Sequence, residues 1–285
     1  MLPEENWFLA STYKAILQRI HDECKGHVEI HLNTPVTEIV SQQTPTSLGR
    51  PISVKVAGGE SLEFDEIVAT VPLGWLKHNK RSFKPPLPVQ VSAAIDHIGY
   101  GRLEKVYITF EQAFWETHGS SHQQPFIYRF LDPAYAYEQN RDQRSVECFS
   151  MAALPQPCKQ PTLLFYLNGP TSASLTKMIR NLPRDSKDWQ AKLTSYFRPY
   201  YSRLPNYHEG HCPLNFCATD WQNDEFAGFG SYSTYQVSEK SDELVELDKD
   251  IDILRIGTSS IMHVGACHGS GRLEFCALDL VPTHR

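Results

Sequence analysis

The sequence predicts a mixed α/β (α+β) fold, and three observations carry this prediction. Residues 11–24 place apolar side chains at helical spacing. Residues 52–64 alternate apolar with polar side chains on either side of a Gly-Gly turn, which is the pattern of a β-hairpin. Residues 126–167 contain three short apolar runs between turn-rich segments, which predicts an antiparallel sheet.

The remaining helices and strands are predicted from the same two patterns, the helical spacing and the strand alternation of apolar residues. The expected strands cover residues 28–32, 36–40, the 52–64 hairpin, 66–71, 106–110, 126–130, 146–151 and 163–167. The expected helices cover residues 11–24, 89–98 and 188–197. The run 66–71 is more continuously apolar, so we expect that strand to be buried on both faces. From Pro213 onward the pattern is less regular.

Composition and charge narrow the class of function. The formal net charge is −6, which argues weakly against a nucleic-acid surface and is compatible with a cationic substrate. No run approaches the roughly 18 apolar residues that a membrane-spanning helix needs, so we expect neither a membrane nor a nucleic acid as partner. Residues 1–7 do not resemble a secretory signal, and residues 283–285 carry no peroxisomal or lipidation motif. We therefore expect an intracellular, cytoplasmic protein.

Cysteine and histidine usage suggests no metal chemistry. The chain has seven cysteines and no C-x-x-C pair, so we expect reduced, mostly buried thiols. His263, Cys267 and His268 lie close together in the sequence. Because no second ligand cluster accompanies them, we expect no metal site there.

Three motifs follow one another between Asp65 and Trp115. Residues 65–77 read D-E-I-V-A-T-V-P-L-G-W-L-K, residues 83–88 read F-K-P-P-L-P, and residues 98–106 read I-G-Y-G-R-L-E-K-V. In order and spacing they resemble the central segment of the flavin-containing amine oxidases, a family that includes polyamine oxidases, monoamine oxidases and lysine-specific histone demethylases. Residues 33–39, and Trp221 followed by G-S-Y-S at 230–233, fit the same family.

The resemblance implies a partial FAD-binding Rossmann-like domain and a substrate domain with a mixed or antiparallel sheet and helices. On this basis residues 1–84 belong to the partial FAD-binding domain, 85–212 to the substrate-binding domain, and 213–285 to a degenerate C-terminal part of the FAD-binding domain. The family's G-x-G-x-x-G unit, which places a pyrophosphate at a helix N-terminus, does not occur in this sequence. We therefore expect the sequence to correspond to the C-terminal portion of such an enzyme, without the N-terminal dinucleotide-binding unit.

The resemblance also implies a reaction, the oxidation of an amine, with a polyamine as the expected substrate. In this family a hydride passes from the carbon beside the amine nitrogen to N5 of FAD, and oxygen then reoxidises the cofactor with release of hydrogen peroxide. The cofactor supplies this chemistry, and the protein supplies orientation and charge control. Lys105 matches the family lysine near N5 and is the expected catalytic residue. Taken without the motif, Lys105 also fits an ordinary surface lysine at the start of a strand.

The same resemblance implies a set of cofactor-binding residues. A buried strand that ends in proline provides a fixed backbone that could lie against a cofactor, although it also fits a plain strand terminator. Trp221 and Tyr232 could line an aromatic slot over the flavin, and core aromatic residues are the alternative. The residues implied are Val36, Thr70, Val71, Pro72, Leu73, Trp221, Ser231 and Tyr232.

The later part of the sequence departs from the family pattern. Residues 258–260 read T-S-S where the family has G-E-[HA]-T, and residues 270–275 read S-G-R-L-E-F where it has W-x-S-G. Two alternatives to a catalytic amine oxidase therefore stay open. One is a truncated, non-catalytic remnant or pseudoenzyme that acts at most as an interaction module, and the other is a histone-demethylase-like protein.

Overall fold

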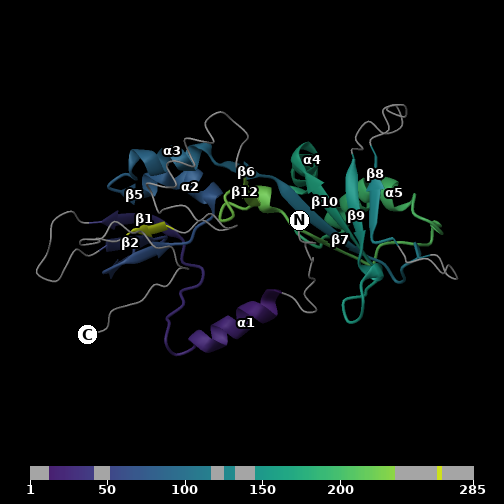
Figure 1. Ribbon diagram of the computed structural model, residues 1–285, viewed down its shortest axis with the longest axis horizontal. Coiled ribbons are helices and arrows are strands. Elements are labelled where there is room, and N and C mark those ends of the chain that lie inside the picture. The colour runs from purple at the N-terminus through teal and green to yellow at the C-terminus, as the bar shows by residue number, and fades with distance from the viewer. Residues whose placement is uncertain (1–12, 42–51, 117–124, 132–144, 235–261, 265–285) are drawn as a thin grey trace, which may run out of the picture. The chain divides into compact units, whose positions relative to one another are not determined.

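The computed structural model describes residues 13–41, 52–116, 125–131, 145–234 and 262–264 (Figure 1). The chain divides into two compact units, Met1–Arg19 with Arg102–Asn223, and Ile20–Gly101 with Asp224–Arg285. We call them the first and the second unit. The organisation into segments 1–84, 85–212 and 213–285 stays a prediction. Helices and sheets are both well represented, so the α/β class is confirmed.

The first unit is built on one antiparallel sheet of five strands, in the order β11-β7-β10-β9-β8. The strands are β7 (Leu103–Thr109), β8 (Ile127–Phe130), β9 (Val146–Ser150), β10 (Thr162–Asn168) and β11 (Asn215–Ala218). Helix α4 (Gly169–Ile179) contacts β10 and β7, and helix α5 (Lys187–Tyr201) contacts β11 (Figure 1). The 3₁₀ turns η3 (Met151–Ala153) and η4 (Trp221–Asn223) complete the unit.

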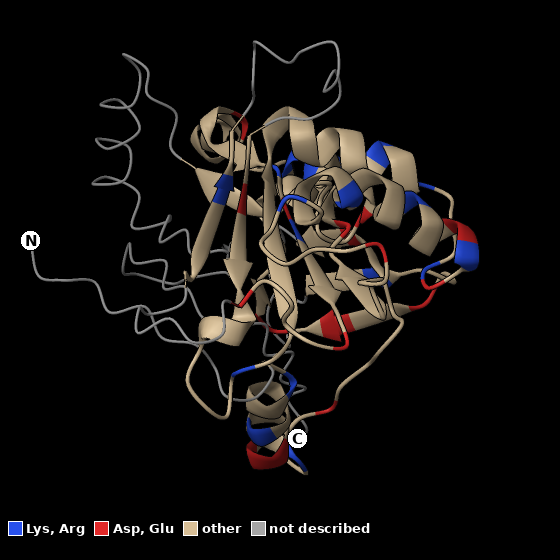
Figure 2. Ribbon diagram, turned by 90° about the vertical axis from the view of Figure 1, so that its right-hand side faces the viewer, with Lys and Arg blue, Asp and Glu red and all other residues tan. Residues whose placement is uncertain are grey.

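The pleat of β7 decides which side chains enter the core of this unit. Successive residues of a strand point to opposite faces of the sheet. Val106 and Ile108 are fully buried on one face, and Lys105 and Tyr107 are half-buried on the other. In Figure 2 the charged positions lie mainly on helices and turns, whereas the strands are mostly uncharged.

The second unit contains a four-stranded sheet in the order β3-β2-β1-β5. Its strands are β1 (Val36–Ser41), β2 (Ile52–Val56), β3 (Ser61–Phe64) and β5 (Phe83–Lys84), and only the β1–β5 pair is parallel. Two further strand pairs are β4 (Ile67–Ala69) with β13 (Met262–Val264), and β6 (Gly99–Gly101) with β12 (Tyr232–Thr234). Helices α2 (Leu73–Asn79) and α3 (Val89–His97) and the 3₁₀ turn η1 (Lys80–Ser82) follow β4.

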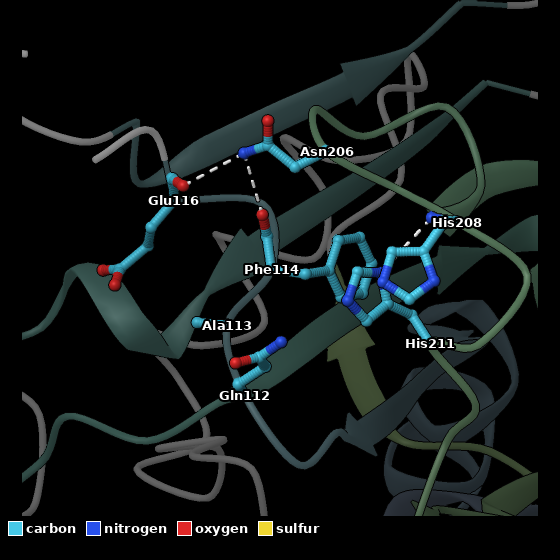
Figure 3. A pocket seen from close by; sticks show the side chains of 7 residues that line it. All are labelled: Gln112, Ala113, Phe114, Glu116, Asn206, His208 and His211. Carbon is cyan, nitrogen blue, oxygen red and sulfur yellow. Dashed lines mark hydrogen bonds between the residues drawn. The ribbon is translucent and has the colours of Figure 1, made fainter. Parts of the chain in front are cut away.

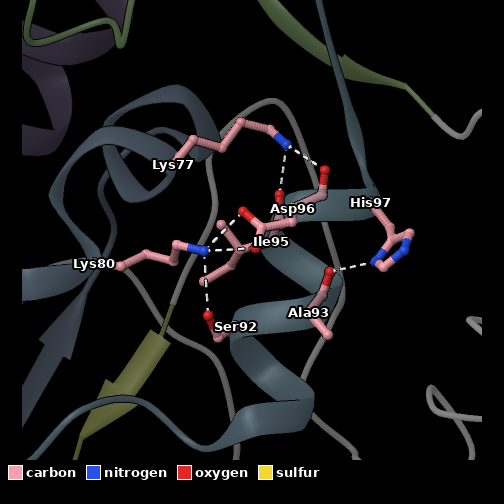
Figure 4. Close-up of polar contacts among 7 residues, drawn as sticks. All are labelled: Lys77, Lys80, Ser92, Ala93, Ile95, Asp96 and His97. Atoms are coloured by element: carbon pink, nitrogen blue, oxygen red, sulfur yellow. Dashed lines mark hydrogen bonds and ion pairs between the residues drawn. The ribbon is translucent and has the colours of Figure 1, made fainter.

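Lys77 of the V-P-L-G-W-L-K motif joins α2 to α3. Its ammonium Nζ donates hydrogen bonds to the carbonyl oxygens of Ile95, at 2.5 Å, and Asp96, at 3.0 Å, in the last turn of α3 (Figure 4). The last carbonyl groups of a helix lack partners inside the helix and carry partial negative charge, so a cation is favourable there. Lys80 forms an ion pair with the Asp96 carboxylate beside this contact.

Most of the expected elements are present, with shifts of a few residues at their ends. The strand expected at 28–32 is wrong, because this segment makes only an isolated bridge between Lys25 and Val28. Ile30 is 53% and Leu32 78% exposed, so within the part of the chain that the structure describes the alternation there is not covered by an apolar surface. Helix α1 (Tyr13–Cys24) is confirmed, although it has no buried residue.

Two further expectations can be compared with the described residues. Among the cysteines there, Cys148 is buried, whereas Cys212 and Cys217 are exposed, so the expectation of mostly buried thiols is wrong. The helices that the structure describes include none with the length and apolar character needed to cross a bilayer.

Candidate active site around Lys105

Lys105 lies in the middle of the central strand pair of the first unit rather than at an exposed strand end. It is half-buried in β7 and stands opposite Tyr166 of β10 in the antiparallel register. Its Nζ lies 5.2 Å from the centre of the Tyr166 ring, within the range of a cation–π interaction. Lys105 is therefore half-buried beside an aromatic ring, and its role beside a cofactor stays a prediction.

Glu104, the residue before Lys105, points to the opposite face of the sheet and is fully buried. One carboxylate oxygen accepts hydrogen bonds from the Thr219 hydroxyl, at 2.6 Å, and from the backbone N–H of Trp221, at 3.2 Å. The other accepts from the backbone N–H and the side-chain amide of Gln222, at 3.1 Å and 3.3 Å. Glu104 was not among the predicted site residues, although a carboxylate that precedes Val106 and Ile108 on the same buried strand face was a signal.

Thr219 connects the Glu104 carboxylate to the backbone of Lys105. Its hydroxyl oxygen accepts the Lys105 N–H at 2.8 Å, and its own N–H donates to the Lys105 carbonyl at 2.9 Å. One threonine thus fixes both backbone polar groups of Lys105 while its hydroxyl donates to Glu104.

Trp221 begins the 3₁₀ turn η4, and its side chain is 43% exposed. The turn is anchored on its other residues: Gln222 donates to Ser172 of α4 at 3.0 Å, and Asn223 donates to the Thr176 carbonyl of α4 at 3.1 Å. An anchored turn therefore presents a large aromatic ring to the outside. This exposure excludes a core aromatic as the explanation of Trp221.

The predicted turn of Thr70, Val71, Pro72 and Leu73 lies in the second unit, between β4 and α2. Thr70, Val71 and Pro72 are half-buried. Leu73 is only 2% exposed and packs in the hydrophobic core of this unit. Its side chain therefore has a core role, and only its backbone could face a ligand.

Val36, Ser231 and Tyr232 also belong to the second unit. Val36 begins β1 and is half-buried, and the Ser231 N–H donates to the Gly101 carbonyl at 3.0 Å. Tyr232 pairs with Gly101 across β12 and β6, and a Cβ on that glycine would lie 2.6 Å from the tyrosine ring. The tyrosine is thus locked by close packing against a backbone that has no side chain.

A cavity of about 630 Å³ lies beyond the other end of β7 and does not include Lys105. Figure 3 shows the His211 imidazole lying flat on the Phe114 ring, with centroids 4.3 Å apart and an interplanar angle of 9°. Asn206 donates to the carbonyl oxygens of Phe114 and Glu116 at 3.0 Å and 3.1 Å and holds this wall together. The lining residues are Gln112, Ala113, Phe114, Glu116, Asn206, His208 and His211.

Across the described residues, no three His, Cys, Asp or Glu side chains are arranged to hold a metal ion. His263 lies in β13, but its side chain is outside the description, as are Cys267 and His268. The altered residues at 258–260 and 270–275 also lie outside the described residues.

Comparison with known proteins decides the family. Residues 3–269 match the family model described as flavin containing amine oxidoreductase. The chain belongs to this family. The match covers most of the sequence, and the two groups of predicted site residues lie within it.

Several members of the flavin containing amine oxidoreductase family resemble the chain over much of its length. A probable polyamine oxidase 4 of Arabidopsis thaliana is 25% identical over 85% of this chain and 42% of its own length. A lysine-specific histone demethylase 1 homolog 3 of Oryza sativa subsp. indica is 26% identical over 82% of this chain and 25% of its own. The human peroxisomal N(1)-acetyl-spermine/spermidine oxidase is 40% identical over a shorter stretch, 23% of this chain and 13% of its own. The chain thus spans less than half the length of these relatives.

Among solved structures, a putrescine oxidase variant aligns with 78% of this chain and 41% of its own, at 17% identity and a TM-score of 0.49.

FAD is the cofactor that this family implies, and the residues present fit it in two respects. Lys105 keeps its ammonium group on the half-buried face of the sheet rather than in the apolar core. The half-buried Thr70, Val71 and Pro72 leave a backbone segment at a strand end that is not sealed inside the core. The Leu73 side chain is buried, so of this residue only the backbone could lie against the cofactor.

Proposed function

We propose that this chain carries the lysine-bearing part of a flavin-dependent amine oxidase whose substrate is a small amine, most specifically a polyamine. Its support is the position of Lys105, held through Thr219 beside a turn that presents Trp221. The family match supports a flavin enzyme. The names of two relatives, a polyamine oxidase and an N(1)-acetyl-spermine/spermidine oxidase, support the substrate class.

When bound, FAD supplies the acceptor for a hydride from the carbon beside the amine nitrogen and passes the electrons to oxygen, which gives hydrogen peroxide. The residues of this chain orient the substrate, exclude water and hold charge. The Lys105 ammonium can donate a hydrogen bond to a water molecule, which is needed later to hydrolyse the imine product.

The groups around Lys105 favour the form of the amine that can be oxidised. An amine must lose its own proton before its lone pair can assist the departure of a hydride. A neighbouring ammonium disfavours a second positive charge, so Lys105 favours the neutral form of a substrate amine. The half-buried rings of Tyr107 and Tyr166 lie on the same face, where they can hold the alkyl chain and attract its distal ammonium groups.

Burial raises the pKa of the Tyr107 phenol, with smaller effects from Tyr166 and Cys217. The Tyr107 hydroxyl therefore remains protonated at neutral pH and presents a neutral hydrogen-bonding group, not a phenolate. On this face, Lys105 supplies positive charge beside the neutral Tyr107 phenol.

The experiment is a peroxide assay on the 285-residue chain with added FAD, with spermine, spermidine, their N-acetylated forms and a methylated histone-tail peptide as separate substrates. The expected result is turnover with one of the polyamines that falls by about 10²-fold or more in Lys105→Met, a change within the usual range for loss of a proton-handling group. Turnover with the peptide alone points to the demethylase-like alternative. FAD binding without turnover on any amine favours the non-catalytic alternative.

A further inference from the structure

The buried carboxylate of Glu104 is saturated by one short segment of chain. Its two oxygens accept four hydrogen bonds, all of them from Thr219, Trp221 and Gln222. Two of the four donors are the consecutive backbone N–H groups of Trp221 and Gln222. The carboxylate therefore fixes the position of the backbone at the start of η4.

The environment of Glu104 makes this arrangement costly to lose. Burying an ionised carboxylate is unfavourable unless its oxygens are fully hydrogen-bonded. The next residues on this face of β7, Val106 and Ile108, are fully buried and apolar. An apolar side chain in place of Glu104 would leave the two backbone N–H groups of the turn unpaired inside the protein.

The same network reaches Lys105 on the opposite face of the strand. Thr219 donates to Glu104 through its hydroxyl and is tied to Lys105 through the hydroxyl oxygen and the backbone N–H. Glu104 thus holds Trp221 directly and supports the backbone of Lys105 through a single residue.

We propose that Glu104 is a positioning residue that sets the Trp221 indole and the Lys105 side chain in their places for amine oxidation. The inference rests on the proposed function for its kinetic consequence only. Its structural content, that Glu104 holds the turn bearing Trp221, stands on the hydrogen bonds alone.

Substitution of Glu104 by glutamine removes one acceptor oxygen while the side chain keeps its size and shape. A glutamine fills the same space but has an NH₂ group in place of one oxygen. Thr219 can reverse its hydroxyl, and the Gln222 side chain can rotate its amide, to accept from that NH₂. The backbone N–H of Trp221 or of Gln222 cannot reverse, so one of them faces another donor and the turn must move.

The first measurement is ¹⁹F NMR of the chain labelled with 5-fluorotryptophan. The chain has five tryptophans in all. Trp221→Phe identifies the Trp221 resonance. Glu104→Gln is expected to shift or broaden that resonance while leaving those of the buried Trp115 and Trp189 in place. Val146→Ala, in the core on β9, is the control for general loss of stability, and it should leave the Trp221 resonance unchanged.

The second measurement is the rate of FAD reduction by a polyamine under anaerobic conditions, with FAD supplied to the chain. Misplacement by about 1 Å can cost about 10²-fold in rate. Glu104→Gln is therefore expected to lower the reduction rate by about 10- to 100-fold, with a change in the apparent amine Kd of less than about 3-fold. Val146→Ala should reduce neither quantity by more than about 3-fold.

If Glu104→Gln does not fold, a pair at Thr219 tests the same network. Thr219→Val removes the hydroxyl that joins Glu104 to Lys105, whereas Thr219→Ser keeps it. Thr219→Val should move the Trp221 resonance and Thr219→Ser should restore it. An unchanged Trp221 resonance in Glu104→Gln, or equal spectra for the two Thr219 variants, overturns the proposal. If the wild-type chain fails to reduce FAD, the proposed function fails and the NMR result still decides the role of Glu104.

Discussion

Gly74 and Gly228 meet in the second unit at a distance that leaves no room for a side chain on either. A Cβ on Gly74 would lie 2.2 Å from the carbonyl oxygen of Gly228, and a Cβ on Gly228 would lie 2.1 Å from the backbone nitrogen of Trp75. Gly228 also has a φ of +73°, which favours glycine. Gly74 belongs to the V-P-L-G motif and Gly228 lies just before G-S-Y-S, so two motifs far apart in the sequence are joined by direct backbone contact.

Gly74→Ala is expected to destabilise the second unit by about 1–3 kcal/mol or more, because the added methyl group meets backbone atoms that cannot rotate away. The measurement is urea or thermal unfolding followed by circular dichroism. Val89→Ala is the matched control, since Val89 is 80% exposed and its truncation should change stability by less than about 0.5 kcal/mol. Equal stability of the two variants would show that the backbone contact is looser than described.

The contact of Lys77 with the end of α3 gives a second prediction. Burial lowers the pKa of Lys77, yet its ammonium is retained by two carbonyl acceptors, from Ile95 and Asp96. Lys77→Met is expected to cost about 1 kcal/mol, because the helix end loses its charged donor and the site is partly solvated.

Lys80→Met is the control for Lys77→Met. It removes the Lys80–Asp96 ion pair, in which the Asp96 side chain is 57% exposed, and should cost less than about 0.5 kcal/mol. Chemical unfolding of both variants at neutral pH and in 1 M salt separates them. If salt removes the stability loss of Lys77→Met to the same extent as that of Lys80→Met, hydrogen bonding of Lys77 to the end of α3 is not the cause of the loss.

His211 gives a prediction for pH. Burial, together with the neighbouring His208, lowers the pKa of His211 below its ordinary value of 6.5. Its Nδ1 is the acceptor for the His208 backbone N–H, so the stacked imidazole is neutral. A lowered folded-state pKa means that the unfolded chain takes up the proton first as the pH falls. The stability that neutral His211 contributes is therefore fully present above about pH 6.5 and is lost as the pH falls through its folded-state pKa.

His211→Phe keeps an aromatic ring against Phe114 but cannot be protonated. We expect the melting temperature of the wild-type chain to fall more between pH 7.5 and pH 5 than that of His211→Phe. His208 is present in both proteins, so the two proteins differ only at residue 211. Equal falls in the two proteins would mean that His211 is not the group responsible.

The sequence was sufficient for the strands whose two faces differ in polarity. The alternation in 52–64 identified β2, which buries one face in the core, and β3, where Leu62 and Phe64 are half-buried on one face. The same alternation failed at 28–32, where no strand among the described residues supplies backbone partners. Helix α4 was missed because its buried face includes Thr171, Ser172 and Thr176, which do not form an apolar periodicity.

The resemblance of the motif points to Lys105, whose role stays a prediction, but it does not point to the residues that hold Lys105 in place. The contacts of Glu104 depend on a turn more than a hundred residues later in the chain. Nothing in the local pattern around residue 104 indicates that its acceptors face two backbone N–H groups at 221 and 222. Such a contact is long-range, and a single sequence contains no local signal for it.

Trp221 gives the last prediction, since hydrogen bonds to its backbone fix the turn that carries a partly exposed indole. Its side chain is 43% exposed, so Trp221→Ala should cost clearly less than the about 3–5 kcal/mol typical of a fully buried tryptophan. The same substitution should slow FAD reduction by a polyamine by about 10-fold or more, because the aromatic surface that excludes water and contacts the amine is lost. Trp221→Phe keeps part of that surface and should lose less. Stopped-flow reduction of the FAD-loaded chain, alongside unfolding of all three proteins, measures both effects. A large loss of stability in Trp221→Ala with reduction unchanged would instead make Trp221 a packing residue of the turn.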